Sequence, residues 1–254
     1  MTKSIYNSAF YSAYESDSIG SAREVLAIVN TLICPKSVVD VGCGIGTWLK
    51  VWRELGVKNI KGIDGDYVDR KELLIPVEHF TPMNLAAPVN PGGSFDLVES
   101  LEVAEHLPKD SAEAFVAFLC SLGPVVLFSA AIPYQGGTDH INEQWPEYWA
   151  ELFKKQGHLT VDAIRNEVWD DPKVAYYYAQ NSFLFVKAEV VDRLNPAIKP
   201  FLATSPKALA RVHPRRWQDS YENPPKLEEL AKVIPKSSMD FASRSFRKLT
   251  KVIK

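Results

Sequence analysis

Four residues near the middle of the chain have the types and spacing to activate a hydroxyl group. Glu102, Glu105 and His106 stand at i, i+3 and i+4, so in a helix they lie on one face. His140 follows in TDHINEQW. Two carboxylates and two imidazoles can hold a hard cation such as Mg²⁺, which orients a hydroxyl and lowers its pKa. One interpretation is therefore a metal site on all four residues. Glu105, His106 and His140 are therefore the candidate catalytic residues.

The same segment also allows catalysis without a metal. Glu102 would then line a cofactor pocket, and His106 would cap a helix or bond to the backbone. His140 is then the candidate general base, because an imidazole beside a reacting hydroxyl can take its proton as the oxygen attacks. Asp139 beside it and Glu143 one turn further on are expected to orient the ring.

A glycine-rich turn upstream of these residues predicts a nucleotide-like ligand. In VVDVGCGIGTWLK, a strand containing Asp40 leads through Gly42, Gly44 and Gly46 into a helix. Such a turn brings backbone N–H groups close to a ligand. The dinucleotide fingerprint G-x-G-x-x-G needs glycine at position 47, where this chain has Thr47. An NAD-dependent Rossmann enzyme is therefore a disfavoured alternative.

The pattern of apolar residues predicts an α/β fold. Strands alternating with helices indicate a mainly parallel sheet with helices on both faces. Strands are expected at 37–41, 59–63, 77–80, 95–98, 125–129, 159–164 and 182–190, and helices at 21–32, 47–55, 109–122 and 146–156. Ser21 is the expected N-cap of the first helix. The last two strands lack a clear intervening helix, so we expect them to pair antiparallel. Asp64 ends the second strand, where a carboxylate can accept both hydroxyl protons of a ribose.

These motifs resemble the class I S-adenosylmethionine (SAM) methyltransferases over residues 38–190. G-x-G-x-G after an acidic residue resembles motif I of that family. FDLVESLEVAEHLP resembles motif IV and the following helix of the group that includes ubiquinone-biosynthesis O-methyltransferases. The resemblance implies a Rossmann-like seven-stranded sheet whose last strand is antiparallel, and an enzyme that uses SAM. The implied cofactor residues are Asp40, Gly42, Gly44, Gly46, Asp64 and Glu102, with Asn84 and Leu85 at the adenine.

The acceptor is expected to be a hydroxyl of a small molecule. PYQGGTDHINEQWPEYWAELF resembles bacterial methyltransferases that modify sugars or polysaccharide precursors, which makes a sugar the first choice and a phenol an alternative. The absence of Asn/Asp-Pro-Pro-Tyr after the fourth strand argues against methylation of planar amines. Glu, Glu, His and a later His resemble the magnesium site of small-RNA 3′-end 2′-O-methyltransferases, so a metal-dependent RNA enzyme is a second alternative. A non-catalytic SAM-binding protein is least favoured.

Composition and charge limit the remaining possibilities. The 254 residues are 46% hydrophobic, which suits one large domain with a full core. No apolar run is long enough to span a bilayer and no leader is recognisable, so a cytoplasmic protein is expected. The three widely spaced cysteines indicate reduced thiols.

The charge is distributed unevenly along the chain. Residues 204–254 hold 12 Lys and Arg against 5 Asp and Glu, whereas the rest holds 17 against 26. We therefore expect a methyltransferase domain over 1–203, with an N-terminal cap segment, and a basic, proline-interrupted extension over 204–254. The extension could contact anionic lipid, but the acidic body and the lack of an RNA-binding module argue against nucleic acid. The oligomeric state is left open.

Overall fold

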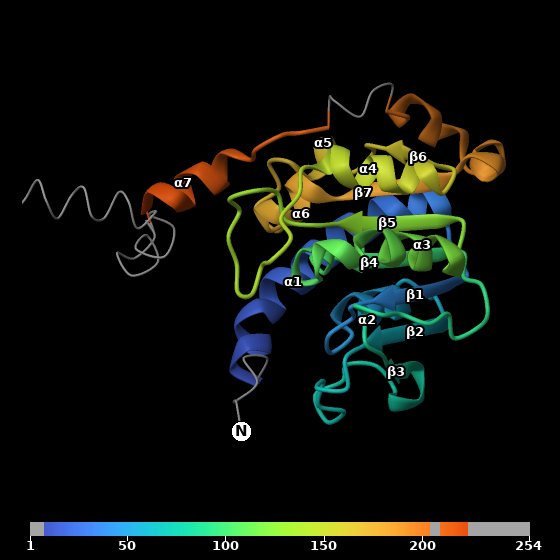
Figure 1. Ribbon diagram of the computed structural model, residues 1–254, viewed down its shortest axis with the longest axis horizontal. Coiled ribbons are helices and arrows are strands. Elements are labelled where there is room, and N and C mark those ends of the chain that lie inside the picture. Colours follow the sequence, from blue (N-terminus) through green and yellow to red (C-terminus); the bar gives the residue numbers. More distant parts are fainter. Residues whose placement is uncertain (1–7, 204–208, 223–254) are drawn as a thin grey trace, which may run out of the picture. The chain divides into compact units, whose positions relative to one another are not determined.

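One seven-stranded sheet organises the part of the chain that the computed structural model describes, residues 8–203 and 209–222. Its strand order is β3-β2-β1-β4-β5-β7-β6 (Figure 1). The strands are β1 (Ser37–Val41), β2 (Asn59–Asp64), β3 (Phe80–Pro82), β4 (Leu97–Leu101), β5 (Val125–Ser129), β6 (His158–Val161) and β7 (Phe183–Lys187). β1 pairs parallel with β2 and β4, whereas β7 pairs antiparallel with β5 and β6. The predicted mainly parallel sheet with an antiparallel last strand is confirmed.

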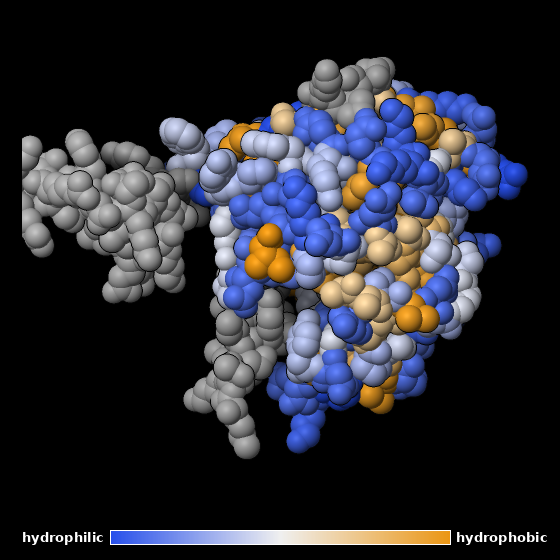
Figure 2. All heavy atoms as spheres, in the orientation of Figure 1, coloured by the Kyte–Doolittle hydropathy of each residue, from blue (hydrophilic) through white to orange (hydrophobic). Residues whose placement is uncertain are grey.

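Helices cover both faces of the sheet, as predicted. They are α1 (Ser8–Ile33), α2 (Thr47–Glu54), α3 (Ala112–Leu122), α4 (Pro146–Lys155), α5 (Arg165–Val168) and α6 (Tyr176–Asn181). Successive strand residues point to opposite faces. Val38 thus belongs to a core that contains Trp52 of α2, and Val39 to a second core that contains Phe115 of α3. In Figure 2 the face that carries α3 is mostly hydrophilic, with more hydrophobic residues gathered over that helix.

Several element boundaries differ from the prediction. α1 begins at Ser8, and Ser21 lies inside it, where its hydroxyl accepts a hydrogen bond of 2.9 Å from the Ala175 N–H. The segment expected as a third strand is a 3₁₀ turn, Val77–His79, followed by the three-residue edge strand β3. Proline explains this difference, because Pro76 precedes the turn and Pro82 cannot donate to a ladder.

The later strands also shift. β4 runs to Leu101 instead of residue 98, while β6 and β7 each end three residues earlier than expected. After β7 the chain turns into the 3₁₀ segment Ala188–Arg193. Between β6 and β7, where no clear helix was expected, the chain forms the two short helices α5 and α6.

The expected helix through Glu102, Glu105 and His106 does not form. Glu102 follows β4 with a φ of 53°, and Ala104–His106 form a single 3₁₀ turn. The residue before a proline avoids the helical region, and Leu107 before Pro108 is accordingly extended, with φ −93° and ψ 149°. α3 therefore begins only at Ala112, so the two glutamates and His106 do not share a helix face.

The chain divides into two compact units, Met1–His213 and Pro214–Lys254. In the second unit the structure describes α7, Pro214–Glu222. The predicted boundary between 203 and 204 adjoins residues 204–208, which lie outside the described ranges, so it remains a prediction. Most of the basic extension also lies outside them. Within the described residues, no helix has the length and apolar character needed to cross a bilayer, and the expected cytoplasmic location stays a prediction.

Candidate active site

A cavity of ≈ 1010 Å³ opens where the parallel strands end. Its lining comes from the loops after β1 to β5, together with Ser18 of α1 and the three tyrosines of α6. Carboxyl ends of neighbouring parallel strands lie at one edge of a sheet, which is why segments far apart in sequence meet here. Nearly all predicted site residues line this cavity, namely Asp40, Gly42, Gly44, Asp64, Asn84, Leu85, Glu102, Glu105, His106 and His140.

The glycine loop after β1 has the shape that its spacing predicts. Gly42 has a φ of 88°, and a Cβ added there would lie 2.3 Å from a methyl carbon of Val103. No side chain fits at this position without displacing the loop after β4. Gly46 is the one predicted cofactor residue that does not line the cavity; its left-handed conformation, φ 86°, precedes the first turn of α2.

The carboxylate of Asp64 ties the end of β2 to the glycine loop. One oxygen accepts the Gly44 N–H at 2.7 Å, and the other accepts the Gly65 N–H and the Tyr67 hydroxyl, both at 2.6 Å. An ionised carboxylate has about four acceptor positions, so three are already used. A ribose could bond through both hydroxyls only if the Tyr67 hydroxyl, from a residue 57% exposed, gives way.

His140 is held by Glu143, and both lie in the loop between β5 and α4. The Glu143 carboxylate lies 3.1 Å from His140 Nδ1 and accepts hydrogen bonds of 2.7 Å from the Tyr134 and Gly136 N–H groups. Burial alone would raise the pKa of Glu143, but these hydrogen bonds hold that pKa below its usual range. Of the two predicted orienting residues, Glu143 therefore fills the role and Asp139 does not. The loop approaches the ring so closely that a Cβ on Gly137 would lie 2.2 Å from His140 Nε2.

Glu105 and His106 enter the cavity from the 3₁₀ turn after β4. Glu105 is fully buried, and neither carboxylate oxygen makes a hydrogen bond of good geometry. Burial, and next the charge of Glu102, raise the pKa of Glu105 well above its usual range. Burial, and next the charge of His140, lower the pKa of His106. The rings of His106 and His140 meet edge to face, with centroids 4.8 Å apart.

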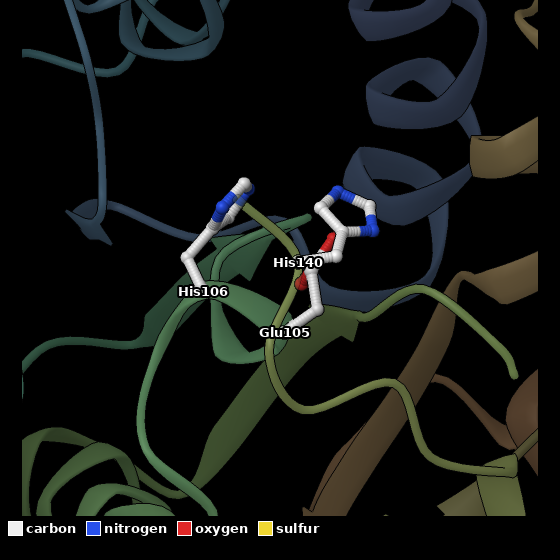
Figure 3. Close-up of side chains that lie close together, drawn as sticks. All are labelled: Glu105, His106 and His140. Carbon is white, nitrogen blue, oxygen red and sulfur yellow. The ribbon is translucent and has the colours of Figure 1, made fainter. Parts of the chain in front are cut away.

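The structure brings together three of the four predicted metal ligands. Glu105, His106 and His140 point toward a common region (Figure 3), and one ligand atom from each lies within 4.8 Å of the others. Opposed ligands of an octahedral Mg²⁺ lie about 4.2 Å apart, so a small adjustment would suffice. Glu102 does not join them. Its two oxygens accept hydrogen bonds from Gln135 at 3.0 Å and Asn181 at 3.2 Å.

Comparison with known proteins decides the family. A family model described as a methyltransferase domain matches residues 19–169, more than half of the chain. The chain belongs to the class I SAM-dependent methyltransferases. No curated protein sequence matches this methyltransferase.

Solved structures agree in fold. An O-methyltransferase family protein from Burkholderia thailandensis superposes with a TM-score of 0.53 and 16% identity, over 70% of this chain and 58% of that chain. DesVI from Streptomyces venezuelae gives a TM-score of 0.52 and 13% identity, over 71% of this chain and 96% of that chain. Our methyltransferase thus spans less than two thirds of the first of these proteins. Identities this low show a shared fold and carry no information about the acceptor.

The cavity of the methyltransferase fits SAM in charge as well as in position. Among the described residues that line it, none is Lys or Arg, while six are acidic: Asp40, Asp64, Asp66, Glu102, Glu105 and Asp139. Of these six, only Asp66 forms an ion pair with a described basic side chain, that of Arg70. Buried carboxylates without a basic partner favour a ligand that brings positive charge, and SAM carries a sulfonium.

Several functional residues escaped the sequence analysis. Gln135 and Asn181 bond to Glu102, and Tyr67 bonds to Asp64. Glu99 was also missed. It stands opposite Asp40 in the β1–β4 register and accepts the Trp52 indole N–H at 2.8 Å. An acidic residue inside the apolar strand FDLVESL, and two carboxamides directly before β7, were the available signals.

Burial raises the pKa values of both Asp40 and Glu99, which stand opposite each other on β1 and β4. Burial raises the pKa of Glu99 to about 8, although the Trp52 hydrogen bond lowers it in part. Burial first, and then the charges of Glu99 and Asp64, raise the pKa of Asp40 well above its usual range. Glu99 is therefore largely protonated at neutral pH and limits the negative charge behind the glycine loop.

We predict that Glu99→Gln flattens the dependence of stability on pH. A folded-state pKa of about 8 against an ordinary 4.5 means that the native state holds a proton that the unfolded state releases. This contribution to the free energy of unfolding falls as pH rises from about 5 to 8, by up to about 1.4 kcal/mol per pH unit. Gln has no such proton and can still accept the Trp52 N–H. Thermal melts of both proteins between pH 5 and 8 measure the difference.

The matched control is Glu72→Gln, which changes an exposed carboxylate outside the cavity. Its melting profile should run parallel to that of the wild type. Parallel profiles for Glu99→Gln as well would contradict the assignment of a buried proton to Glu99.

Proposed function

We propose that this methyltransferase methylates a hydroxyl of a small uncharged molecule, with a sugar ring as the first choice. The observation that carries the proposal is the His140–Glu143 pair beside the cavity. A carboxylate that accepts the Nδ1 proton leaves Nε2 as the basic nitrogen of the ring. An oriented imidazole of this kind is suited to remove a proton from a hydroxyl as it reacts.

The side chains divide the reaction between them. The cofactor supplies a methyl group bonded to a positively charged sulfur. Asp64 would hold the ribose and Glu102 would face the sulfonium, while His140 Nε2 takes the acceptor proton. As the acceptor oxygen bonds to the methyl carbon, the carbon–sulfur bond breaks, and S-adenosylhomocysteine and a methyl ether are formed. Holding the reacting atoms in line is the main contribution of the cavity.

The acidic lining of the cavity favours an uncharged acceptor. A phosphate or carboxylate brought into the cavity would meet acidic groups and, among the described lining, no Lys or Arg. Burying an anion without a cationic partner costs several kcal/mol. Sugar hydroxyls instead can donate to carboxylates, and the half-buried rings of Tyr176 and Tyr177 offer apolar faces. The same argument counts against RNA, whose phosphates would approach the reacting ribose.

We predict that His140→Ala lowers kcat by about 10²–10⁴-fold, because an oriented base typically contributes that factor. Affinity for S-adenosylhomocysteine should stay within about twofold, since His140 acts on the acceptor side. Glu143→Gln should fall between the wild type and His140→Ala, because Gln keeps one acceptor oxygen for the two loop N–H groups and carries no charge to orient the ring. Initial rates and calorimetry measure the two effects.

The acceptor is found first with a panel of neutral glycosides, sugar phosphates, nucleotide sugars, phenols and short RNA. We expect turnover with the neutral glycosides. A preference for phenols would change the acceptor from a sugar to an aromatic hydroxyl and leave methyl transfer to a hydroxyl unchanged. Selective turnover of RNA, or full activity in His140→Ala, would contradict the proposal.

A cation-assisted reaction is a second candidate, favoured by Glu105. A buried carboxylate whose two oxygens make no hydrogen bond of good geometry needs either a proton or a cation. One carboxylate and two imidazoles also form a donor set that suits Mn²⁺ or Fe²⁺ better than the expected Mg²⁺, which prefers oxygen ligands. Glu105, His106 and His140 would hold the cation, and its charge would lower the pKa of a nearby hydroxyl. His140 would then be a ligand and not the base.

We predict that, if this second candidate holds, the wild type binds one Mn²⁺ and loses turnover in EDTA. Glu105→Gln should weaken Mn²⁺ binding by at least about tenfold, because Gln keeps the shape and removes the charge. Electron paramagnetic resonance of free Mn²⁺ measures the binding directly. Glu113→Gln, an exposed carboxylate on α3, serves as the control. Turnover that survives EDTA, with no Mn²⁺ bound, would remove the cation and leave His140 as the base.

A further inference from the structure

Three buried carboxamides surround the carboxylate of Glu102. Gln135 Nε2 donates to one of its oxygens at 3.0 Å, and Asn181 Nδ2 donates to the other at 3.2 Å. Gln180, which is fully buried, donates through Nε2 to Gln135 Oε1 at 3.2 Å and to Asn181 Oδ1 at 3.0 Å. Asn181 Nδ2 also donates to Gln135 Oε1 at 3.0 Å. These contacts join α6 and the loop after β5 to the end of β4.

Each amide in this network can face only one way. An amide group has donors on one side and an acceptor on the other, so reversing one would bring oxygen against oxygen. Reversing Asn181, for example, would turn its carbonyl toward the Glu102 carboxylate. The donors that reach Glu102 are therefore set from two sides. The Ile132 main-chain N–H donates to Gln135 Oε1 at 3.3 Å, and Gln180 Nε2 contacts both of the other amides.

The orientation of Gln180 is fixed from outside the sheet. Its Oε1 accepts the main-chain N–H of His213 at 2.8 Å, and a main-chain N–H cannot exchange roles with an acceptor. The segment 209–213 is itself anchored by Arg165, which is fully buried and donates to the Leu209 carbonyl at 2.7 Å and to the Gln180 carbonyl at 3.3 Å. Asp162 balances this charge at 2.6 Å.

Glu102 lies at the opposite end of the cofactor site from the ribose. Asp64 ends β2 and Glu102 follows β4, and β1 with its glycine loop runs between those two strands. A cofactor whose ribose bonds to Asp64 and which crosses the glycine loop therefore brings its sulfonium toward Glu102. This placement is part of the proposed function, and the inference below rests on it.

We propose that Gln180 is a positioning residue for SAM and that segment 209–213 is part of the active-site scaffold. Together with the Ile132 N–H at Gln135, the His213 N–H acts through Gln180 to select the donor arrangement that holds Glu102 toward the positively charged end of the cofactor. The residue that touches the cofactor is Glu102, and Gln180 acts through it. Loss of Gln180 or of the His213 N–H should therefore weaken SAM, yet spare a ligand that has only the adenosine half.

Two substitutions at one position isolate the main-chain donor. His213→Ala removes the imidazole and keeps the N–H, whereas His213→Pro removes both. Calorimetry with SAM and with 5′-methylthioadenosine, which lacks the sulfonium charge and the amino-acid chain, gives the readout. The expected result is that His213→Pro binds SAM about tenfold more weakly than His213→Ala, while the two bind 5′-methylthioadenosine equally.

Gln180→Met repeats the test without changing the sequence of segment 209–213, because Met has a similar length and no amide to accept the His213 N–H. It should show the same loss for SAM and little change for 5′-methylthioadenosine. Equal weakening of both ligands in Gln180→Met would mean a purely structural role, and unchanged SAM affinity would mean no role; either result overturns the proposal. These are binding measurements, so they remain decisive even if no hydroxyl acceptor is found and the proposed function fails.

Discussion

Burying carboxylates where no basic side chain reaches them is the constraint on which the rest of this site depends. The fold meets it differently at each position. Asp64 accepts three donors, Glu102 accepts two amides, and Glu99 takes up a proton beside the Trp52 indole. Neither oxygen of Glu105 makes a hydrogen bond of good geometry. The cavity is thus built to receive positive charge, which the sulfonium of SAM brings and a cation at Glu105 could add.

The cofactor half and the acceptor half of the site are positioned by different means. Strand ends of a parallel sheet place Asp64 and Glu102 on either side of the glycine loop, so the cofactor half follows from the topology. The acceptor half depends on a loop with few regular hydrogen bonds, which Glu143 holds by accepting two N–H groups and meeting the His140 ring. Loops of this kind carry specificity on a rigid scaffold. This division explains why the family is evident while the acceptor remains a proposal.

The sequence was sufficient wherever a local rule decides the structure. Glycine spacing predicted the loop after β1, and apolar periodicity predicted the sheet and its antiparallel end. The prediction from sequence failed where a neighbouring residue overrides a pattern. The i, i+3, i+4 spacing suggested a helix through Glu102 and His106, but Pro108 keeps Leu107 extended. It also could not find Gln180 or Glu99, because their importance comes from partners far away in the chain, His213 and Trp52. The acidic residue within FDLVESL and the carboxamides before β7 are visible in the sequence, but a single sequence does not show which distant residues they pair with.

Buried carboxylates that need a cation should release protons when a cationic cofactor binds, and these protons can be counted. Calorimetric titration near pH 7, in two buffers that differ in ionisation enthalpy, gives the number of protons released. SAM carries one more positive charge than S-adenosylhomocysteine and should drive protons off the carboxyl groups whose pKa values burial has raised. We expect SAM to release more protons than S-adenosylhomocysteine. Equal release by the two ligands would contradict this expectation.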